Sequence, residues 1–341
     1  MHINNYLKFK SINKKQCFLS ICFLFIFLLL FTIFLFFNPS TLSLDIPYGP
    51  NANFIWNSRI QLALKLTIGS SAIGLSNYLF QLFTKNKLAD ISIMGINTFQ
   101  QIVVALFILF ATNFFLIYEQ SFIFSFIYLS ISILSGVIFY FISWRNDLSS
   151  KNIFIYGILL NILVTALSYF ILSSNVVDQD TYKDRVIYYQ NKVFGNLVVS
   201  DDFSNLYVSS ILLVFCFIWT FCLRLKFMAK TFMIQKTNTL GINNKWINLN
   251  LILLVSILSS IAFGFFGIIA FIGVSVSFIS NKLFFHFKYN VLGSILISII
   301  LMFISQYAQI IIANLVSSFS LTTIVGFISC LIFMFFLWLN R

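Results

Sequence analysis

The chain has 341 residues, of which 60% are hydrophobic and only 9% are charged, and its mean hydropathy is +0.97. A soluble domain of this size needs a charged surface, so this composition excludes an ordinary soluble protein and indicates one that lies in a membrane. The net charge of +12 is dispersed between apolar segments, whereas a nucleic-acid-binding surface needs its Lys and Arg residues gathered on one face of the folded protein.

Apolar runs divide the chain into candidate membrane spans, since about 20 apolar residues cross a bilayer core of about 30 Å. The first run follows a basic start but has no small-x-small cleavage site close behind it, so we expect a retained span rather than a signal peptide. The spans are expected at residues 17–37, 60–83, 92–117, 121–143, 153–173, 206–225, 248–267, 268–281, 292–314 and 321–340. The piece at 268–281 is short. The sequence therefore predicts an all-α polytopic protein with a single transmembrane domain over residues 1–341.

The charges separate by side once these spans are marked. Most Lys and Arg fall in one set of loops, while the acids of the other set include Asp45, Asp180, Asp184 and Asp201. Short loops rich in Lys and Arg stay in the cytoplasm, so both termini are expected there, in a multi-pass protein of the cell membrane. A count of ten spans agrees with this, because nine would place Arg341 outside.

The chemistry of an enzyme is missing from the sequence. It has no GxxxxGK[ST], HExxH or GxSxG motif, and its five cysteines form no CxxC pair. We therefore expect no catalytic residue, no metal site and no cofactor bound by this chain. No acid lies in the middle of a predicted span, which weighs against an ion-driven carrier, although carriers that use backbone carbonyls remain possible.

Several polar side chains nevertheless fall inside the predicted spans. Asn161 and Gln306 are candidates for a translocation pathway, because each lies well within an otherwise apolar segment. Hydrogen bonds between helices are the alternative for both. Lys65, near the outer end of the second span, is expected to extend its ammonium group to the lipid headgroups.

Two segments between spans are long enough to carry function. The predicted outer segment, residues 176–205, mixes acids, bases and tyrosines and could form a short surface helix. The predicted inner segment, residues 226–247, is basic and contains Leu240 and Gly241, where glycine would permit a sharp turn between two helical pieces.

From the second span onward the sequence resembles the permeases of iron–siderophore, haem and cobalamin ABC importers, the FecCD-type family. That family shows Arg-x-Pro-Arg before its second helix, then Gln, Asn-Pro-Leu-Ala and Gly. The matching positions are Arg59, Gln81, Asn86, Leu88, Ala89 and Gly95. Lys87 replaces the proline and Leu62 replaces the second arginine, so the individual motifs are degraded while their order and spacing remain.

Later positions continue the resemblance to residue 340. Thr239, Leu240, Gly241 and Ile242 resemble the Leu-Gly segment of the family's inner loop, which seats in the ATPase subunits. Gly267 and the stretch from Ala270 to Gly273 resemble Gly-Phe-Ile-Gly, but Ser277 and Phe278 replace the Pro-His that should follow. The Glu-Leu-Pro-x-Gly signature of the last helix keeps only Gly326.

The resemblance implies a type II ABC importer permease that takes up a ferric-siderophore-like chelate, with haem and cobalamin less favoured. ATP would be hydrolysed on two partner subunits, and an extracytoplasmic binding protein would deliver the chelate. The motif losses favour a second, different permease subunit over a homodimer. The outer bases available for docking the binding protein are Arg59, Lys183, Arg185 and Lys192. A secondary transporter or facilitator that works without ATP is the alternative.

Overall fold

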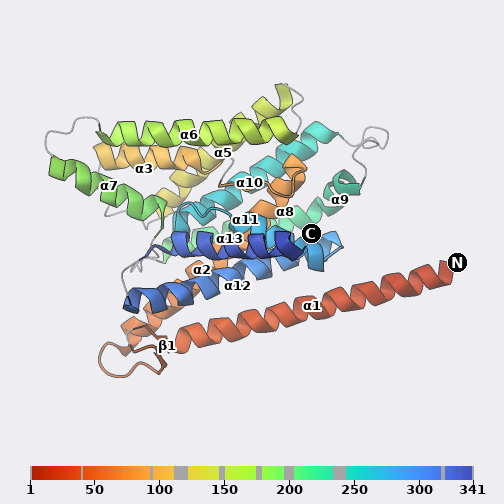
Figure 1. The fold of residues 1–341 in the computed structure, drawn as a ribbon, viewed down its shortest axis with the longest axis horizontal. Coiled ribbons are helices and arrows are strands. Elements are labelled where there is room, and N and C mark those ends of the chain that lie inside the picture. The colour runs from red at the N-terminus through yellow and green to blue at the C-terminus, as the bar shows by residue number, and fades with distance from the viewer. Residues whose placement is uncertain are drawn as a thin grey trace.

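The computed structural model describes residues 2–39, 41–92, 95–110, 122–145, 150–173, 179–195, 203–232, 243–315 and 319–339. Within these ranges the chain is almost entirely helical (Figure 1). The helices are α1 His2–Phe36, α2 Ala52–Thr84, α3 Thr98–Phe110, α5 Phe122–Arg145, α6 Ser150–Ser173, α7 Gln179–Val193, α8 Ser204–Cys222, α9 Arg224–Phe232, α10 Asn244–Phe266, α11 Ile272–Leu283, α12 Phe287–Leu315 and α13 Leu321–Leu339.

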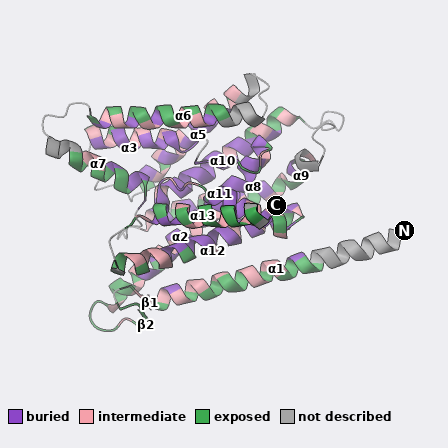
Figure 2. Ribbon diagram, in the orientation of Figure 1, coloured by how far each residue is buried: buried purple, intermediate pink, exposed green. Residues whose placement is uncertain are grey.

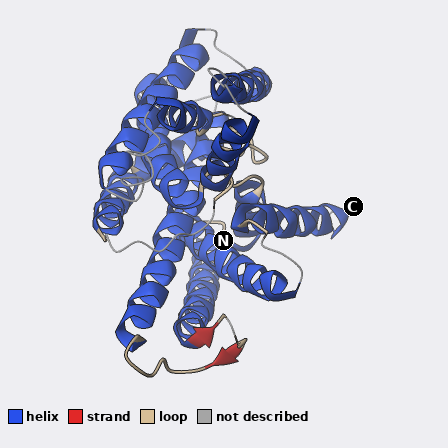
Figure 3. Ribbon diagram, turned by 90° about the vertical axis from the view of Figure 1, so that its left-hand side faces the viewer, coloured by secondary structure: helices blue, strands red, loops and turns tan. Residues whose placement is uncertain are grey.

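A small antiparallel hairpin joins α1 to α2. Its strands are β1 Phe37–Asn38 and β2 Ser43–Leu44, and Phe37 pairs with Leu44. Figure 3 shows the hairpin beyond the ends of these two helices. In Figure 1 the hairpin and α7 lie at one end of the molecule, while α9, the start of α1 and the end of α13 lie towards the other. The hairpin end is the one that the charge pattern predicts to face outside.

Each predicted span has a helix over it, which confirms the all-α polytopic fold. Six of the described helices are long and apolar enough to cross a membrane, namely α1, α5, α6, α8, α10 and α12, and α3 and α13 are shorter apolar helices. A helix satisfies its own backbone hydrogen bonds, which the lipid core cannot do. The chain is therefore a multi-pass membrane protein. The expected surface helix in residues 176–205 is present as α7.

α2 and α10 form the centre of the bundle. α2 packs against α10 and α12, and α10 also packs against α5 (Figure 2). In the apolar stretch of α10, 83% of the residues are buried inside the protein, whereas in the apolar stretch of α1 only 6% are buried. α10 is therefore a core helix and α1 a peripheral one. The largest cluster of buried side chains includes Leu66, Leu79, Leu254, Leu258 and Phe303.

The interior helices carry small and polar residues where they touch. Ser132 of α5 donates to the Ser256 carbonyl of α10 at 2.6 Å and lies 2.8 Å from the Ser259 hydroxyl. Small hydroxylated residues let membrane helices approach closely and hydrogen-bond to each other. α2 likewise buries Gln61 and Lys65, because it is surrounded by protein rather than lipid.

The structure corrects one prediction on α2. Lys65 is only 2% exposed, so its side chain lies inside the bundle and does not extend to the headgroups.

Candidate translocation, docking and coupling sites

Gln81 joins three parts of the chain that are distant in sequence. From α2, its Nε2 donates to the Ala89 carbonyl at 3.1 Å and to the Ser277 hydroxyl of α11 at 2.6 Å. Ser277 stands where the family resemblance leads us to expect a proline. The hydroxyl at this position therefore accepts a hydrogen bond between α2 and α11 that a proline side chain could not accept.

Asp90 lies in the loop between α2 and α3 and is only 1% exposed. Its Oδ1 accepts hydrogen bonds from the Ser92 amide at 2.9 Å and the Ser92 hydroxyl at 2.5 Å, and its Oδ2 accepts from the Gly273 amide at 2.9 Å. Gly273 is in the first turn of α11, where backbone N–H groups lack helical partners and carry partial positive charge. A carboxylate therefore caps this helix from a separate loop.

Asn77 completes the contact between α2 and α11. Its Oδ1 accepts from the Ile91 amide at 3.1 Å, and a Cβ on Gly273 would lie 2.1 Å from its Cγ. Only glycine permits this approach. We call Asn77, Gln81, Asp90, Gly273 and Ser277 the polar clamp. The clamp fixes the loop after α2 against the start of α11.

The remaining family positions lie around the clamp. Asn86 Oδ1 accepts from the Leu88 amide at 3.0 Å, and the Ala89 amide donates to the Asn86 carbonyl at 3.2 Å, which forms a tight turn after α2. Ala89 is buried, whereas Leu88 is 49% exposed. Gly95 precedes α3. Gly326 lies within α13, where a Cβ would lie 3.9 Å from the carbonyl oxygen of Ala270, just before α11.

The turn between α10 and α11 is tied to α7. Gly267 ends α10 with a φ of +69°, a conformation that L side chains rarely adopt. The Ile268 amide donates to the Val193 carbonyl at 2.8 Å, and a Cβ on Gly267 would lie 2.3 Å from that same oxygen. α7 is thus in backbone contact with the turn that leads into the clamp.

The candidate docking bases fall into two groups. Lys183 is exposed and Arg185 half-buried, both on α7. Lys192, also on α7, is 9% exposed; its Nζ donates to the Gly264 carbonyl at 3.3 Å and lies 5.7 Å from the Tyr128 ring centroid. Lys192 therefore faces the bundle rather than the surface.

Arg59 is also engaged within the protein and is 8% exposed. Its guanidinium donates to the Leu35 carbonyl at 3.1 Å, to the Asp45 carbonyl at 3.2 Å and to Asp45 Oδ1 at 3.3 Å. Asn38 donates to Asp45 Oδ2 at 2.6 Å. That hydrogen bond and the Arg59 guanidinium lower the pKa of Asp45, so the carboxylate stays charged and holds the hairpin to α2.

The two candidate pathway residues lie in different parts of the bundle. Asn161 of α6 donates from Nδ2 to the Ser92 carbonyl at 3.4 Å, so it touches the loop that carries the clamp. Gln306 of α12 is 9% exposed, and its Oε1 has no hydrogen-bond partner among the described residues. In Figure 1, α6 and α12 lie on opposite sides of α10. The structure does not bring Asn161 and Gln306 together.

Gln101 makes a further polar contact beside Asn161. Gln101 Oε1 of α3 accepts from the Thr165 hydroxyl of α6 and the Tyr189 hydroxyl of α7, each at 3.3 Å. This contact joins the three helices on that side. A polar residue inside a predicted span is expected either to line a pathway or to form hydrogen bonds between helices, and Gln101 does the latter.

The candidate coupling residues Thr239, Leu240, Gly241 and Ile242 lie outside the described residues. The helices that flank them are described. Asn243 caps α10 by accepting at Oδ1 from the Lys245 amide at 3.0 Å. Lys226 of α9 lies with its Nζ 4.4 Å from the Trp246 ring centroid, a cation–π contact between α9 and α10. This contact holds together the two helices that flank the segment.

Comparison with protein families gives a match over nearly the whole chain. The sequence model of the FecCD transport family matches residues 17–339. The chain belongs to the FecCD transport family. A comparison with curated protein sequences finds no match. As a FecCD member the chain is a transport protein, and the family resemblance expected from its motifs is confirmed.

A solved structure shares the fold of this FecCD chain. It is described as an inward-facing conformation of a metal-chelate type ABC transporter, and it superposes with a TM-score of 0.75 at 14% sequence identity. The match covers 95% of this chain and 99% of that one. At this identity the likeness establishes the fold, which is the helical bundle expected for a type II ABC importer permease.

Proposed function

We propose that the chain is the membrane-spanning permease subunit of an ABC importer that takes up a ferric-siderophore-like iron chelate. The observation that carries this proposal is the FecCD match over residues 17–339. The shared fold with a metal-chelate type transporter supports the same class of cargo. No nucleotide-binding motif is present in the sequence, so ATP would be bound and hydrolysed by two partner subunits.

Force from the ATPase would enter through the segment that contains Gly241. Residues 239–242 would dock on an ATPase subunit at the cytoplasmic side, and the Lys226–Trp246 contact supports this by keeping α9 close to the start of α10. α10 is the most buried of the candidate spans and ends at the Gly267 turn. A movement of α10 would therefore reach the polar clamp and α7 through contacts already present in the fold.

Docking of the binding protein would use α7. Lys183 and Arg185 are the bases we propose for this role, because Lys183 is exposed and Arg185 half-buried, whereas Arg59 and Lys192 are buried. Exposed ion pairs contribute only about 0–1 kcal/mol each, so several would have to act together. Asn161 and Gln306 would line parts of a weakly polar pathway, since the binding protein supplies the affinity for the chelate.

The remaining partners follow from the same proposal. A second permease subunit would complete the membrane core, and the degraded motifs favour a heterodimer. The chain would lie in the cell membrane with both termini in the cytoplasm.

Reconstituted uptake tests the proposal. Vesicles that hold the chain with its second permease, the ATPase and the binding protein should accumulate a radioactive ferric siderophore only when ATP is present. Gly241→Pro should abolish this uptake while membrane insertion stays normal, because proline would prevent the turn at that position. A matched control is Asn53→Pro in the first turn of α2, where a helix tolerates proline, and this variant should leave ATP-driven uptake intact.

The alternative is a facilitator or secondary transporter that needs no ATP. It predicts that the chain alone accumulates the chelate in vesicles and that no ATPase co-purifies with it. Either result would overturn the ABC permease proposal, as would full uptake by the Gly241→Pro variant.

A further inference from the structure

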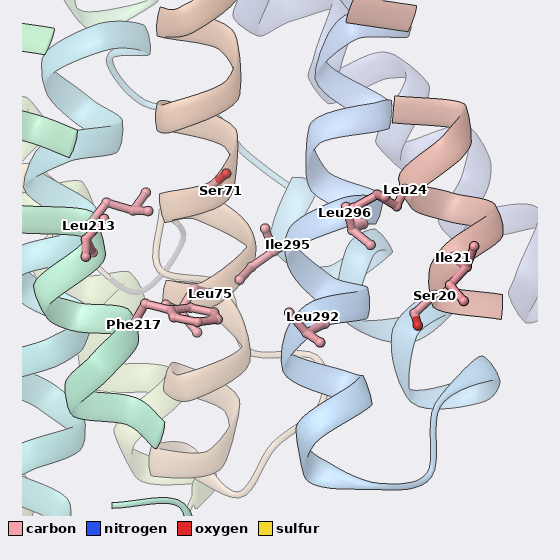
Figure 4. Close-up of a pocket in the computed structure, with 11 residues that line it drawn as sticks. Ser20, Ile21, Leu24, Ser71, Leu75, Leu213, Phe217, Leu292, Ile295 and Leu296 are labelled. Carbon is pink, nitrogen blue, oxygen red and sulfur yellow. The ribbon is translucent and has the colours of Figure 1, made fainter. Parts of the chain in front are cut away.

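A groove with a volume of about 420 Å³ lies between four helices at the periphery of the bundle. Its walls come from α1, α2, α8 and α12 (Figure 4). The lining residues are Ser20, Ile21, Leu24, Ser71, Leu75, Leu213, Val214, Phe217, Leu292, Ile295 and Leu296. This volume is within the range of about 300–1,000 Å³ that is usual for small-molecule sites.

The lining offers no free hydrogen-bond donor to a polar ligand. Both serine hydroxyls are used within their own helices: Ser20 donates to the Cys17 carbonyl at 2.8 Å and Ser71 to the Thr67 carbonyl at 2.5 Å. All other lining residues are aliphatic or aromatic, and Figure 4 shows Ile295 turned towards the space between α2 and α12. Water would lack the polar partners that it needs here, so the occupant must be apolar over this length.

The groove lies in one half of the membrane, on the side predicted to be cytoplasmic. With a rise of about 1.5 Å per residue, Leu292 lies about 8 Å from the start of α12, and Leu75 about 14 Å from the end of α2. The first α1 residue of the lining, Ser20, follows the exposed Lys14 and Lys15 closely. An acyl chain entering from the inner headgroup layer would reach this depth.

Basic side chains stand at the same end and on the same helix faces. Lys288 precedes Leu292 by one helical turn, and Lys14 precedes Ile21 by two, so each lysine shares a face with a lining residue. Both lysines are exposed. A lipid chain in the groove would place its headgroup beside these two positive charges, and basic sites between membrane helices on this side attract anionic headgroups.

We propose that this groove binds one phospholipid of the inner leaflet, with an acyl chain against α2, α8 and α12 and an anionic headgroup beside Lys14 and Lys288. The lipid fills the space between the peripheral helix α1 and the bundle. The lining includes no residue of the polar clamp or of α7. Its occupant is therefore a structural ligand of the permease and not its cargo.

Native mass spectrometry of the purified full-length chain tests the site. After incubation with phosphatidylglycerol or with phosphatidylcholine of identical chains, the protein should retain the anionic lipid about tenfold better. Ser71→Phe fills the floor of the groove and should reduce retention of both lipids. Ser130→Phe is its matched control, because Ser130 of α5 is exposed and donates to its own helix in the same way, to the Phe126 carbonyl at 2.8 Å.

A second pair of variants guards against misfolding of Ser71→Phe. Val214 is 54% exposed at the rim of the groove, so the Val214→Trp variant should fold and still block entry of the lipid's acyl chain. Val137→Trp, on the exposed face of α5, is its control. The double change Lys14→Gln with Lys288→Gln should abolish the preference for phosphatidylglycerol but leave binding of the acyl chain intact. The control double change, Lys87→Gln with Lys245→Gln, should keep the preference.

Several results would overturn the proposal. One is equal retention of the two lipids by the wild-type chain. Another is an equal loss of lipid retention in the Ser71→Phe and Ser130→Phe variants, which would indicate general association of lipid around the protein. A third is a second permease copy or partner helix that cross-links into the groove through Val214→Cys, since the groove would then be a protein interface.

Discussion

Asp90 is a carboxylate buried in a membrane protein, at a position that the charge pattern counts among the inner loops. Its oxygens accept from Ser92 and from the first turn of α11, so the charge is satisfied by backbone and hydroxyl donors rather than by a base. Such charge-assisted bonds are stronger than neutral ones. The acid therefore has a structural explanation that the sequence alone did not offer.

Asp90→Asn is expected to destabilise the protein by about 1–3 kcal/mol, because an amide cannot accept all three hydrogen bonds and would turn an NH₂ group towards a donor. The midpoint of thermal unfolding in detergent measures this loss. Asp184→Asn on the exposed face of α7 is the control and should leave the midpoint unchanged. An unchanged midpoint for Asp90→Asn would show that the cap adds no stability.

Gly273→Ala is expected to cost about 1–3 kcal/mol, since overpacking of a tight contact is destabilising. The new methyl group would lie 2.1 Å from Asn77 Cγ, whereas Gly326→Ala has its nearest neighbour, the Ala270 carbonyl oxygen, at 3.9 Å and should be nearly neutral. The double change Gly273→Ala with Asn77→Ser should lose less stability than the sum of the single changes. Strict additivity would contradict the contact.

At the scale of elements, α7 links the predicted outer surface to the interior. Its last turn binds the Gly267 turn through the Val193 carbonyl, and Lys192 reaches the Gly264 carbonyl of α10. Its first half carries the exposed Lys183 and the half-buried Arg185. Contact with a partner at one end of this helix would therefore act directly on the turn between α10 and α11.

Lys183→Glu with Arg185→Glu is expected to weaken binding-protein docking by about tenfold at low ionic strength, given about 0–1 kcal/mol for each exposed pair lost and some repulsion gained. The difference from wild type should shrink as salt rises, because exposed charges are screened. Surface plasmon resonance at two salt concentrations measures both effects. Lys85→Glu with Lys87→Glu, at the opposite end of the bundle, is the control, and equal affinity for all three proteins would exclude α7 from docking.

For the whole molecule, the sequence predicts the helices better than it predicts their contacts. Apolar runs set the spans, because the bilayer requires about 20 apolar residues in helical form. α3 begins only at Thr98, six residues after the predicted start of its span, because the preceding loop turns inward to carry Asp90 and Asn97 into the bundle. α2 extends back to Ala52, beyond its apolar run.

The polar clamp was beyond the reach of sequence periodicity. Gln81 and Ser277 are 196 residues apart, and Asp90 and Gly273 are 183 apart, so no local pattern connects them. The family motifs did mark Gln81 and Gly273 individually. Arg59 shows the opposite case: its charge suggested a surface role, but the hairpin before α2 supplies Asp45 and encloses the guanidinium.

The orientation of the whole bundle follows from loop charge and is open to a direct test. In intact cells an impermeant amine reagent is expected to modify Lys183 on α7, whereas Lys245 at the start of α10 should react only after permeabilisation; mass spectrometry of the digested protein reads out both sites. Lys14, at the same end as Lys245 by the predicted topology, is the internal control. Modification of Lys245 from outside would reverse the bundle, place residues 239–242 away from any cytoplasmic ATPase and remove the proposed route of coupling. Protection of Lys245 with labelling of Lys183 would place α7 where a binding protein can reach it, with α10 joining that surface to the side on which ATP is hydrolysed.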